Sequence, residues 1–172
     1  HIGYTLAGIS TGTVAGYSSS ITYISIYVIM NLGAFGCIFL MKKDGKYCED
    51  IKDLEGISKQ NPLLAISFLI IMFSLAGIPP LAGFFAKFYV FMSVIETGMY
   101  TLAIVGLLST VISAFYYLRI IKIIYFDEIK DSFDKIKDLG ITSTIFLSCS
   151  ILILFFLYPS ILNNIVNILS IN

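Results

Sequence analysis

Charge is scarce in this sequence. Only 13% of its 172 residues are Asp, Glu, Lys or Arg, while 58% are hydrophobic, and the mean hydropathy is +0.91. A soluble domain is typically about one quarter charged. Eleven basic and eleven acidic residues cancel, which excludes the net positive field by which many proteins bind nucleic acid. We therefore expect an integral membrane protein that is surrounded by lipid and has no nucleic-acid partner.

Patterns that hold a cofactor or a metal ion are missing as well. The sequence has one histidine, His1, and its three cysteines, Cys37, Cys48 and Cys149, are far apart. It contains no Gly-rich phosphate loop, no nicotinamide or flavin fingerprint and no iron–sulfur cysteine set. We expect no cofactor, no metal and no redox centre in this chain, so any redox chemistry belongs to partners.

The chain begins on His1 without a basic segment or a cleavage site typical of a signal peptide. The simplest interpretation is a single membrane domain over residues 1–172 that is a fragment of a larger subunit, or one product of a split gene.

Apolar runs near the 20 residues needed to cross a bilayer predict an all-α polytopic protein with about six transmembrane helices. A Gly/Ser-rich stretch at 16–20 predicts the first break between them. The expected helices are 1–17, 21–41, 62–78, 81–96, 99–126 and 140–158, with Pro159 ending the last and an apolar tail, 160–172, along the surface. Apolar residues at helical spacing in segment 49–58 indicate an amphipathic piece at the membrane interface.

The loop at 42–59 and the group from Arg119 to Lys137 carry five basic residues each. Three predicted spans separate the two groups, so we expect them on opposite sides of the membrane. Basic residues in short loops normally set orientation, and here the rule returns a tie.

One charge, Lys87, lies near the middle of the predicted 81–96 helix. A lysine at a helix centre costs about 2.5–3.5 kcal/mol on insertion scales. Burial disfavours its charged form, so such a lysine can release and regain a proton, which arginine cannot do. The alternative is a shallow Lys87 whose long side chain reaches the interface.

A proline pair just before this lysine indicates a broken helix. Prolines lack an N–H, so the carbonyls of Leu75 and Ala76 lose their helical partners. Broken helices at membrane depth line cavities in transporters, although a proline pair also marks simple turns between spans. The break, its flanking glycines and the lysine together favour proton translocation through Lys87. The predicted broken-helix residues, in the region 77–98, are Gly77, Pro79, Pro80 and Gly83.

Three further residues are weaker candidates for proton translocation. His1 could join a hydrated path, and Arg119 and Lys122, one turn apart near the end of the 99–126 helix, could act as a terminal relay. The simpler interpretation of this pair is an anchor at the lipid headgroups. The tyrosines are interpreted as packing and interfacial residues.

At residues 61–65 and 72–91 the sequence reads NPLLA and MFSLAGIPPLAGFFAKFYVF. These stretches closely resemble the subunit N family of bacterial NADH:quinone oxidoreductase, whose mitochondrial counterpart is subunit 2 of complex I. Residues 1–4, 114–120 and 125–127 match the same family in the same order. The resemblance covers nearly the whole chain.

The resemblance implies the last six of fourteen helices of an antiporter-like fold. It matches Lys87 to the lysine of the second broken helix, in the outer half of the family's proton path. It implies a bacterial or mitochondrial inner membrane, with loop 42–61 outside and loop 127–139 in the cytoplasm or matrix. Partners would be other membrane-arm subunits and the missing amino-terminal part of the same subunit. NADH, flavin, iron–sulfur clusters and quinone would belong to or bind the partner subunits.

The leading functional hypothesis is a non-redox, proton-translocating subunit that couples quinone reduction to pumping through the buried lysine. The alternative is a subunit of a multi-subunit Na+/H+ antiporter. In that group the residue after the lysine is commonly acidic, whereas here it is Phe88. A third hypothesis is a purely structural membrane piece in which Lys87 reaches the interface.

Overall fold

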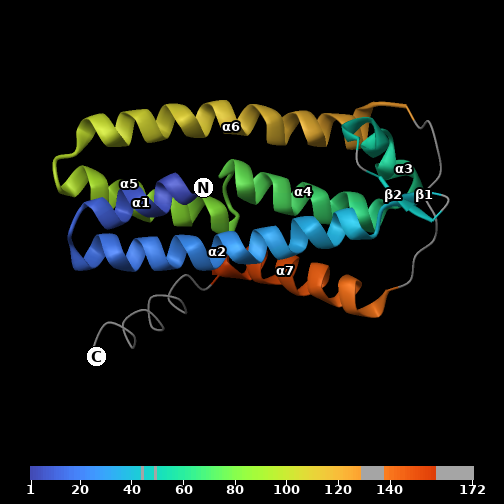
Figure 1. Ribbon diagram of the computed structural model, residues 1–172, viewed down its shortest axis with the longest axis horizontal. Helices are drawn as coiled ribbons and strands as arrows, with labels where there is room; N and C mark the ends of the chain where they lie inside the picture. Colours follow the sequence, from blue (N-terminus) through green and yellow to red (C-terminus); the bar gives the residue numbers. More distant parts are fainter. Residues whose placement is uncertain (44, 49, 129–137, 158–172) are drawn as a thin grey trace.

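Two helices run the length of the molecule, and shorter helices lie between and beside them (Figure 1). The computed structural model describes residues 1–43, 45–48, 50–128 and 138–157. Its elements are α1 (Ile2–Ser10), α2 (Val14–Phe39), strands β1 (Lys42–Lys43) and β2 (Lys46–Tyr47), the 3₁₀ helix η1 (Ile51–Leu54), α3 (Ile57–Gln60), α4 (Pro62–Ala76), α5 (Ala82–Glu96), α6 (Tyr100–Phe126) and α7 (Leu139–Leu157). The described part of the chain is therefore almost entirely helical, as predicted.

α4 and α5 share one crossing of the bundle. Each has 15 residues, about 22 Å at 1.5 Å per residue, which is shorter than the roughly 30 Å hydrocarbon core. Figure 1 shows them following one another along the bundle beside α2 and α6. The prediction of separate spans at 62–78 and 81–96 is therefore wrong, because neither helix is long enough to cross alone. In contrast, α2 and α6 are each long and apolar enough to do so.

The first break lies at residues 11–13 and not at 16–20. Thr13 caps α2 by accepting a hydrogen bond from the Gly16 N–H at 3.0 Å. The small residues that were predicted to break the helix are helical because they form a close contact with α1. A Cβ at Gly16 would overlap the carbonyl oxygen of Gly8, and small residues at such contacts let two membrane helices approach.

α7 packs along α2 at two glycines. A Cβ at Gly33 would lie 3.0 Å from Cβ of Ser148, and one at Gly36 would lie 2.8 Å from Cγ1 of Ile145. The position of α7 agrees with the predicted 140–158 helix, while Pro159 and the tail lie outside the described residues.

The segment predicted as one amphipathic helix at 49–58 consists of two short helices, η1 and α3. They are separated at Gly56, which has φ +69°, a conformation that glycine adopts without steric cost. Leu54 and Ile57 are buried, while Ile51 is 52% exposed. The segment thus covers the end of the bundle with part of its apolar face.

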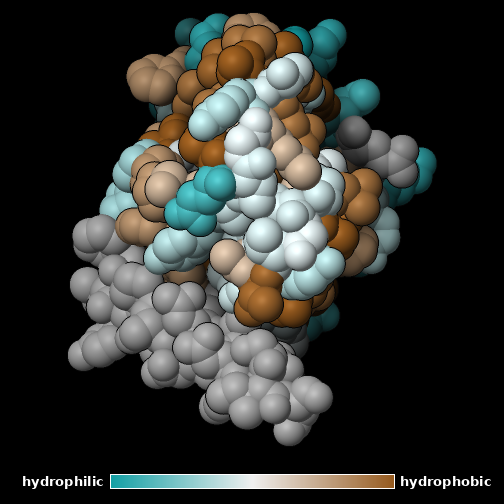
Figure 2. Space-filling view, turned by 90° about the vertical axis from the view of Figure 1, so that its left-hand side faces the viewer, coloured by the Kyte–Doolittle hydropathy of each residue, from teal (hydrophilic) through white to brown (hydrophobic). Residues whose placement is uncertain are grey.

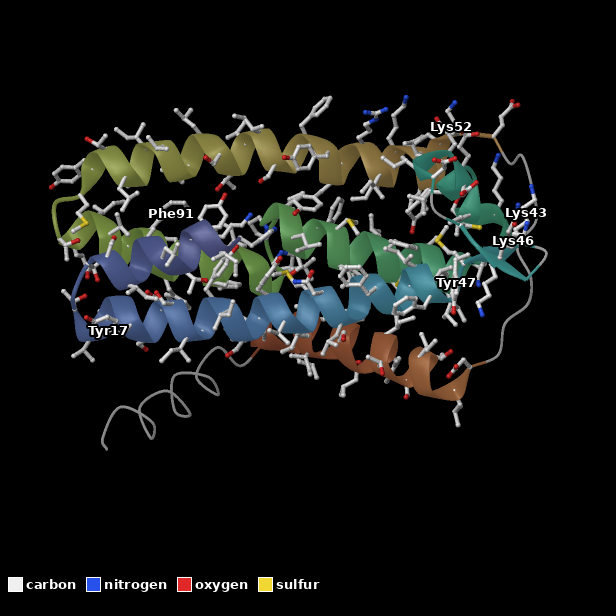
Figure 3. The ribbon with its side chains drawn as sticks, in the orientation of Figure 1. Tyr17, Lys43, Lys46, Tyr47, Lys52 and Phe91 are labelled. Atoms are coloured by element: carbon white, nitrogen blue, oxygen red, sulfur yellow. The ribbon has the colours of Figure 1, made fainter. Side chains whose placement is uncertain are left out.

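The first charged loop and the described residues on either side of 129–137 lie at the same end of the bundle. The Gly56 N–H donates to the carbonyl of Ile123 at 3.2 Å, which joins the first loop to the end of α6. Figure 3 shows Lys43, Lys46 and Lys52 at this end and Tyr17 at the other. The expectation of opposite sides is wrong, because only two crossings, α4 with α5 and then α6, separate the two segments.

The other end carries little charge in the part of the chain that the structure describes. Figure 2 looks onto it, and its centre is weakly polar with hydrophobic side chains around it. The chain turns there at residues 11–13 and 97–99, neither of which contains a charged side chain. Among the described residues, Glu96 is the charged residue next to these turns. The molecule is therefore strongly asymmetric in charge along its length.

This arrangement predicts the sidedness of three exposed positions. In a Cys48→Ser background, cysteines introduced at Lys52 and Glu128 should react with a membrane-impermeant thiol reagent from one side of a sealed vesicle. A cysteine at Glu96 should react from the other side. All three residues are exposed, and the remaining Cys37 and Cys149 are buried. Labelling of positions 52 and 128 from different sides would contradict the shared crossing of α4 and α5.

Candidate functional site

Lys87 lies in the interior, at the junction of α4 and α5. Its side chain is 4% exposed, and its ammonium donates to the carbonyls of Leu75 at 2.9 Å and Ala76 at 3.1 Å. These two carbonyls would normally accept from the N–H groups four residues later, which are absent in Pro79 and Pro80. The lysine therefore satisfies the acceptors that the prolines leave open, and it does not occupy the shallow position considered as an alternative.

Two glycines make room for this junction. Gly77 ends α4 with φ +84°, and a Cβ there would lie 3.1 Å from Cδ and 3.2 Å from Nζ of Lys87. At Gly83, a Cβ would overlap the carbonyl oxygen of Ser74, while the Gly83 N–H donates to Ser74 Oγ at 3.1 Å. The end of α4, the start of α5 and the lysine side chain thus fit together only because both positions lack a side chain.

The positive charge of the Lys87 ammonium is stabilised by the dipoles of carbonyl groups and by an aromatic ring. The carbonyl end of a helix carries a partial negative charge, and Lys87 binds that end of α4. On another side of the ammonium, the ring centroid of Tyr4 lies 5.4 Å from Nζ, within the distance of a cation–π interaction. The contacts found for Nζ in the described part of the chain are therefore two carbonyls and one aromatic ring.

Tyr4 connects the lysine to three other helices. Its ring contacts the rings of Tyr23 on α2 and Phe91 on α5, with centroids 5.5 and 5.7 Å apart. Its hydroxyl lies 2.8 Å from Oγ1 of Thr110 on α6. Phe91, labelled in Figure 3, faces Gly106 on α6, where a Cβ would lie 2.6 Å from Cε1 of the ring. Four helices therefore meet around this tyrosine.

His1 packs beside Tyr4 in the same cluster of aromatic rings. Its Nδ1 lies 2.6 Å from the Tyr23 hydroxyl, and its Nε2 lies 2.8 Å from the Tyr117 hydroxyl. The imidazole also stacks on Tyr27, with centroids 4.7 Å apart. A neutral imidazole donates from one nitrogen and accepts at the other, so this arrangement can pass a hydrogen-bonded proton between the tyrosines of α2 and α6.

A groove of about 460 Å³ lies between α1 and α6 beside this group. His1 and Tyr4 line one side, and Ser109, Ser113 and Tyr117 contribute hydroxyls from the other. A groove of this size with several polar partners can hold ordered water. The site thus has a buried amine, an aromatic and imidazole layer, and beside them a mostly apolar groove that carries a few hydroxyl groups.

The structure places the predicted candidates in two different regions. Lys87, the four broken-helix residues and His1 belong to one site, with Tyr4 between the lysine and the histidine. Arg119 and Lys122 are exposed on α6, beyond Tyr117 and toward the charged end. They are not part of this cluster, and their interpretation as headgroup anchors stays a prediction.

Sequence reasoning missed the tyrosines of the site, which were interpreted as packing residues: Tyr4, Tyr23 and Tyr117. Two signals pointed to them. His1 and Tyr4 are one helical turn apart, and a tyrosine within an apolar run needs a partner for its hydroxyl once it is buried.

Comparison with known proteins gives consistent results. The family described as NADH:quinone oxidoreductase/Mrp antiporter, TM, matches residues 1–113. The chain is 56% identical over 167 residues to NADH-quinone oxidoreductase subunit N of Pelagibacter ubique, covering 97% of this chain and 36% of the relative. It is 46% identical over 161 residues to subunit N of Rhodospirillum rubrum, covering 94% of this chain and 33% of the relative. It therefore spans about a third of the length of these relatives.

Among solved structures, respiratory complex I from Thermus thermophilus with bound Aureothin contains a similar chain. The TM-score is 0.76 at 25% identity, and the match covers 91% of this chain and 35% of the other. The same complex with bound NADH gives a TM-score of 0.75 at 21% identity, which supports the likeness of fold.

Proposed function

The chain belongs to the NADH:quinone oxidoreductase/Mrp antiporter transmembrane family, and from this membership we propose that it forms part of a proton-translocating subunit of a respiratory NADH:quinone oxidoreductase. The observation that carries the proposal is the buried Lys87 ammonium, bound to the open carbonyls of a broken helix. Intramembrane ionisable groups in such positions mark ion and proton pathways.

Lys87 would serve as the proton carrier. Its charged form is stabilised where it lies by two carbonyls and the Tyr4 ring, and burial opposes that charge. These opposing effects allow a modest change in hydration or in a neighbouring charge to shift the balance between ammonium and amine. Water would carry the proton between the lysine and the group formed by His1 and its two tyrosines, because no hydrogen bond joins Nζ to this group among the described residues.

The energy for that shift would come from partners. Quinone reduction elsewhere in the complex would change the conformation or the electrostatic environment of Lys87. Partners in this proposal are the other membrane-arm subunits and the remainder of the same subunit, and NADH, flavin, iron–sulfur clusters and quinone belong to or bind the partner subunits. Basic loops favour the cytoplasmic side, so the charged end would face the cytoplasm of a bacterial inner membrane.

The proposal predicts co-migration with NADH dehydrogenase activity. We expect mild-detergent extracts of native membranes, separated by native electrophoresis, to yield peptides of this chain from the band that stains for the activity. Peptides from the rest of the subunit should be found in the same band. Recovery of the chain only in a smaller band without activity would refute membership of the oxidoreductase.

A multi-subunit Na+/H+ antiporter is the second candidate, because the description of the matched family also names an antiporter. Sodium-dependent proton transport in vesicles, without NADH oxidation, would favour it. The apolar Phe88 after the lysine, and relatives that are named subunit N, favour the oxidoreductase.

A further inference from the structure

We propose that Tyr4 is a positioning residue for proton transfer by Lys87: its ring holds the ammonium against the end of α4, and its hydroxyl joins this position to α6 through Thr110. The inference rests on the proposed proton translocation. It adds that movement of the Tyr4 ring controls whether Lys87 holds or releases its proton.

The ring of Tyr4 distinguishes the two states of the lysine. With the centroid 5.4 Å from Nζ, the negative face of the ring attracts an ammonium, whereas a neutral amine gains no comparable attraction. Contacts with the rings of Tyr23 and Phe91 restrain it. Tyr4 therefore supports the protonated lysine at the carbonyls of Leu75 and Ala76, and displacement of the ring would favour release of the proton.

The hydroxyl of Tyr4 ties the ring to α6. The two hydroxyl oxygens lie 2.8 Å apart. With Thr110 Oγ1 donating to the carbonyl of Gly106 at 3.1 Å, its lone pairs can accept a hydrogen bond from the Tyr4 hydroxyl. This bond crosses from α1 to α6 at the groove that both helices line. A shift of α6 relative to α1 would therefore pull the ring away from the ammonium.

The test uses the complete oxidoreductase in inverted membrane vesicles, and the proton yield is measured as the initial rate of NADH-driven proton uptake per amount of assembled complex. Cation–π interactions of about 0.5–2 kcal/mol correspond to roughly two- to thirtyfold in an equilibrium. We expect Tyr4→Leu to lower the proton yield at least about threefold. Tyr4→Phe, which keeps the ring, should restore most of this loss.

Thr110→Val tests the link to α6. It should reduce the yield to the level of Tyr4→Phe, and the double variant should be no worse than either single variant, because one hydrogen bond is lost in each case. Tyr100→Leu serves as a matched control, since Tyr100 is 62% exposed at the start of α6, and it should leave the yield unchanged.

If Tyr4 had only a structural role, the proton yields of the variants would follow a different pattern. If Tyr4 acts through the lysine, Tyr4→Leu should have no further effect on the yield in a Lys87→Gln background. A normal yield in Tyr4→Leu, or an equal loss in both backgrounds, would overturn the inference. If Lys87→Gln alone leaves the yield normal, the proposed function itself fails; if that variant lowers the yield and Tyr4→Leu does not, only the role of Tyr4 fails.

Discussion

Lys87→Gln should lower proton translocation along this path on the order of a hundredfold, because glutamine keeps a hydrogen-bond donor for the carbonyls of Leu75 and Ala76 but cannot exchange a proton. Loss of a positioned acid–base group typically costs 10²–10⁴ in rate. The measurement is NADH-driven proton uptake by inverted vesicles, with native electrophoresis to show that the complex still assembles. NADH oxidation coupled to this transport should fall with it.

Lys122→Gln is the matched control for this experiment. Lys122 is exposed on α6, so its replacement should leave translocation near the wild-type level. Wild-type turnover and proton stoichiometry in Lys87→Gln would refute the role of the buried lysine. A large loss in Lys122→Gln would instead revive the predicted terminal relay at Arg119 and Lys122.

Lys87→Leu distinguishes a buried lysine that carries protons from a shallow lysine with a purely structural role. A shallow lysine at the interface would be replaced by leucine with a gain in stability. In the observed structure leucine would leave the carbonyls of Leu75 and Ala76 unpaired, and each buried unsatisfied group costs about 1–3 kcal/mol. We therefore expect a lower midpoint of thermal unfolding in detergent for Lys87→Leu than for Lys87→Gln.

The second large effect is expected at Gly83. Gly83→Ala would push a methyl group into the carbonyl oxygen of Ser74, and because that atom belongs to the backbone, α4 must move as a whole. Overpacking of this kind typically costs 1–3 kcal/mol and occasionally more. We expect at least a severalfold loss of assembled complex on native gels, together with a lower unfolding temperature in detergent.

Gly3→Ala is the control for this substitution, since a Cβ at Gly3 would have nothing within 4 Å. It lies in α1 near the same site and should assemble normally. Equal abundance and stability of the two variants would show that the junction of α4 and α5 is looser than the structure indicates.

The sequence predicted the local geometry around Lys87 better than the arrangement of the helices. Two prolines follow Leu75 and Ala76 by four residues, so their open carbonyls could be predicted from covalent structure alone. The need for Lys87 to find partners followed from the cost of an unpaired charge in an apolar environment. Local rules of this kind do not depend on how the helices are arranged.

The arrangement of helices was harder to predict. Residues 62–78 and 81–96 each look like a short span, and only their observed lengths and placement show that they share one crossing. Counting them as two spans also led to the wrong expectation that the two charged loops lie on opposite sides of the membrane. At 16–20, small residues that break a helix in water form a helix–helix contact here, which local sequence does not distinguish. Tyr4 was missed because its partners Lys87 and Thr110 are far away in sequence.

The charge asymmetry along the bundle has a consequence for biogenesis. When a helix inserts into a bilayer, the turn that follows it either crosses the membrane or stays on the side of synthesis. The turns opposite the charged end are three residues long and uncharged, so membrane insertion requires almost no dehydration of ionised groups beyond Glu96 and Lys87. Basic loops normally stay on the side where synthesis occurs, so the lysines of the 42–59 loop would set the orientation of the bundle in the membrane.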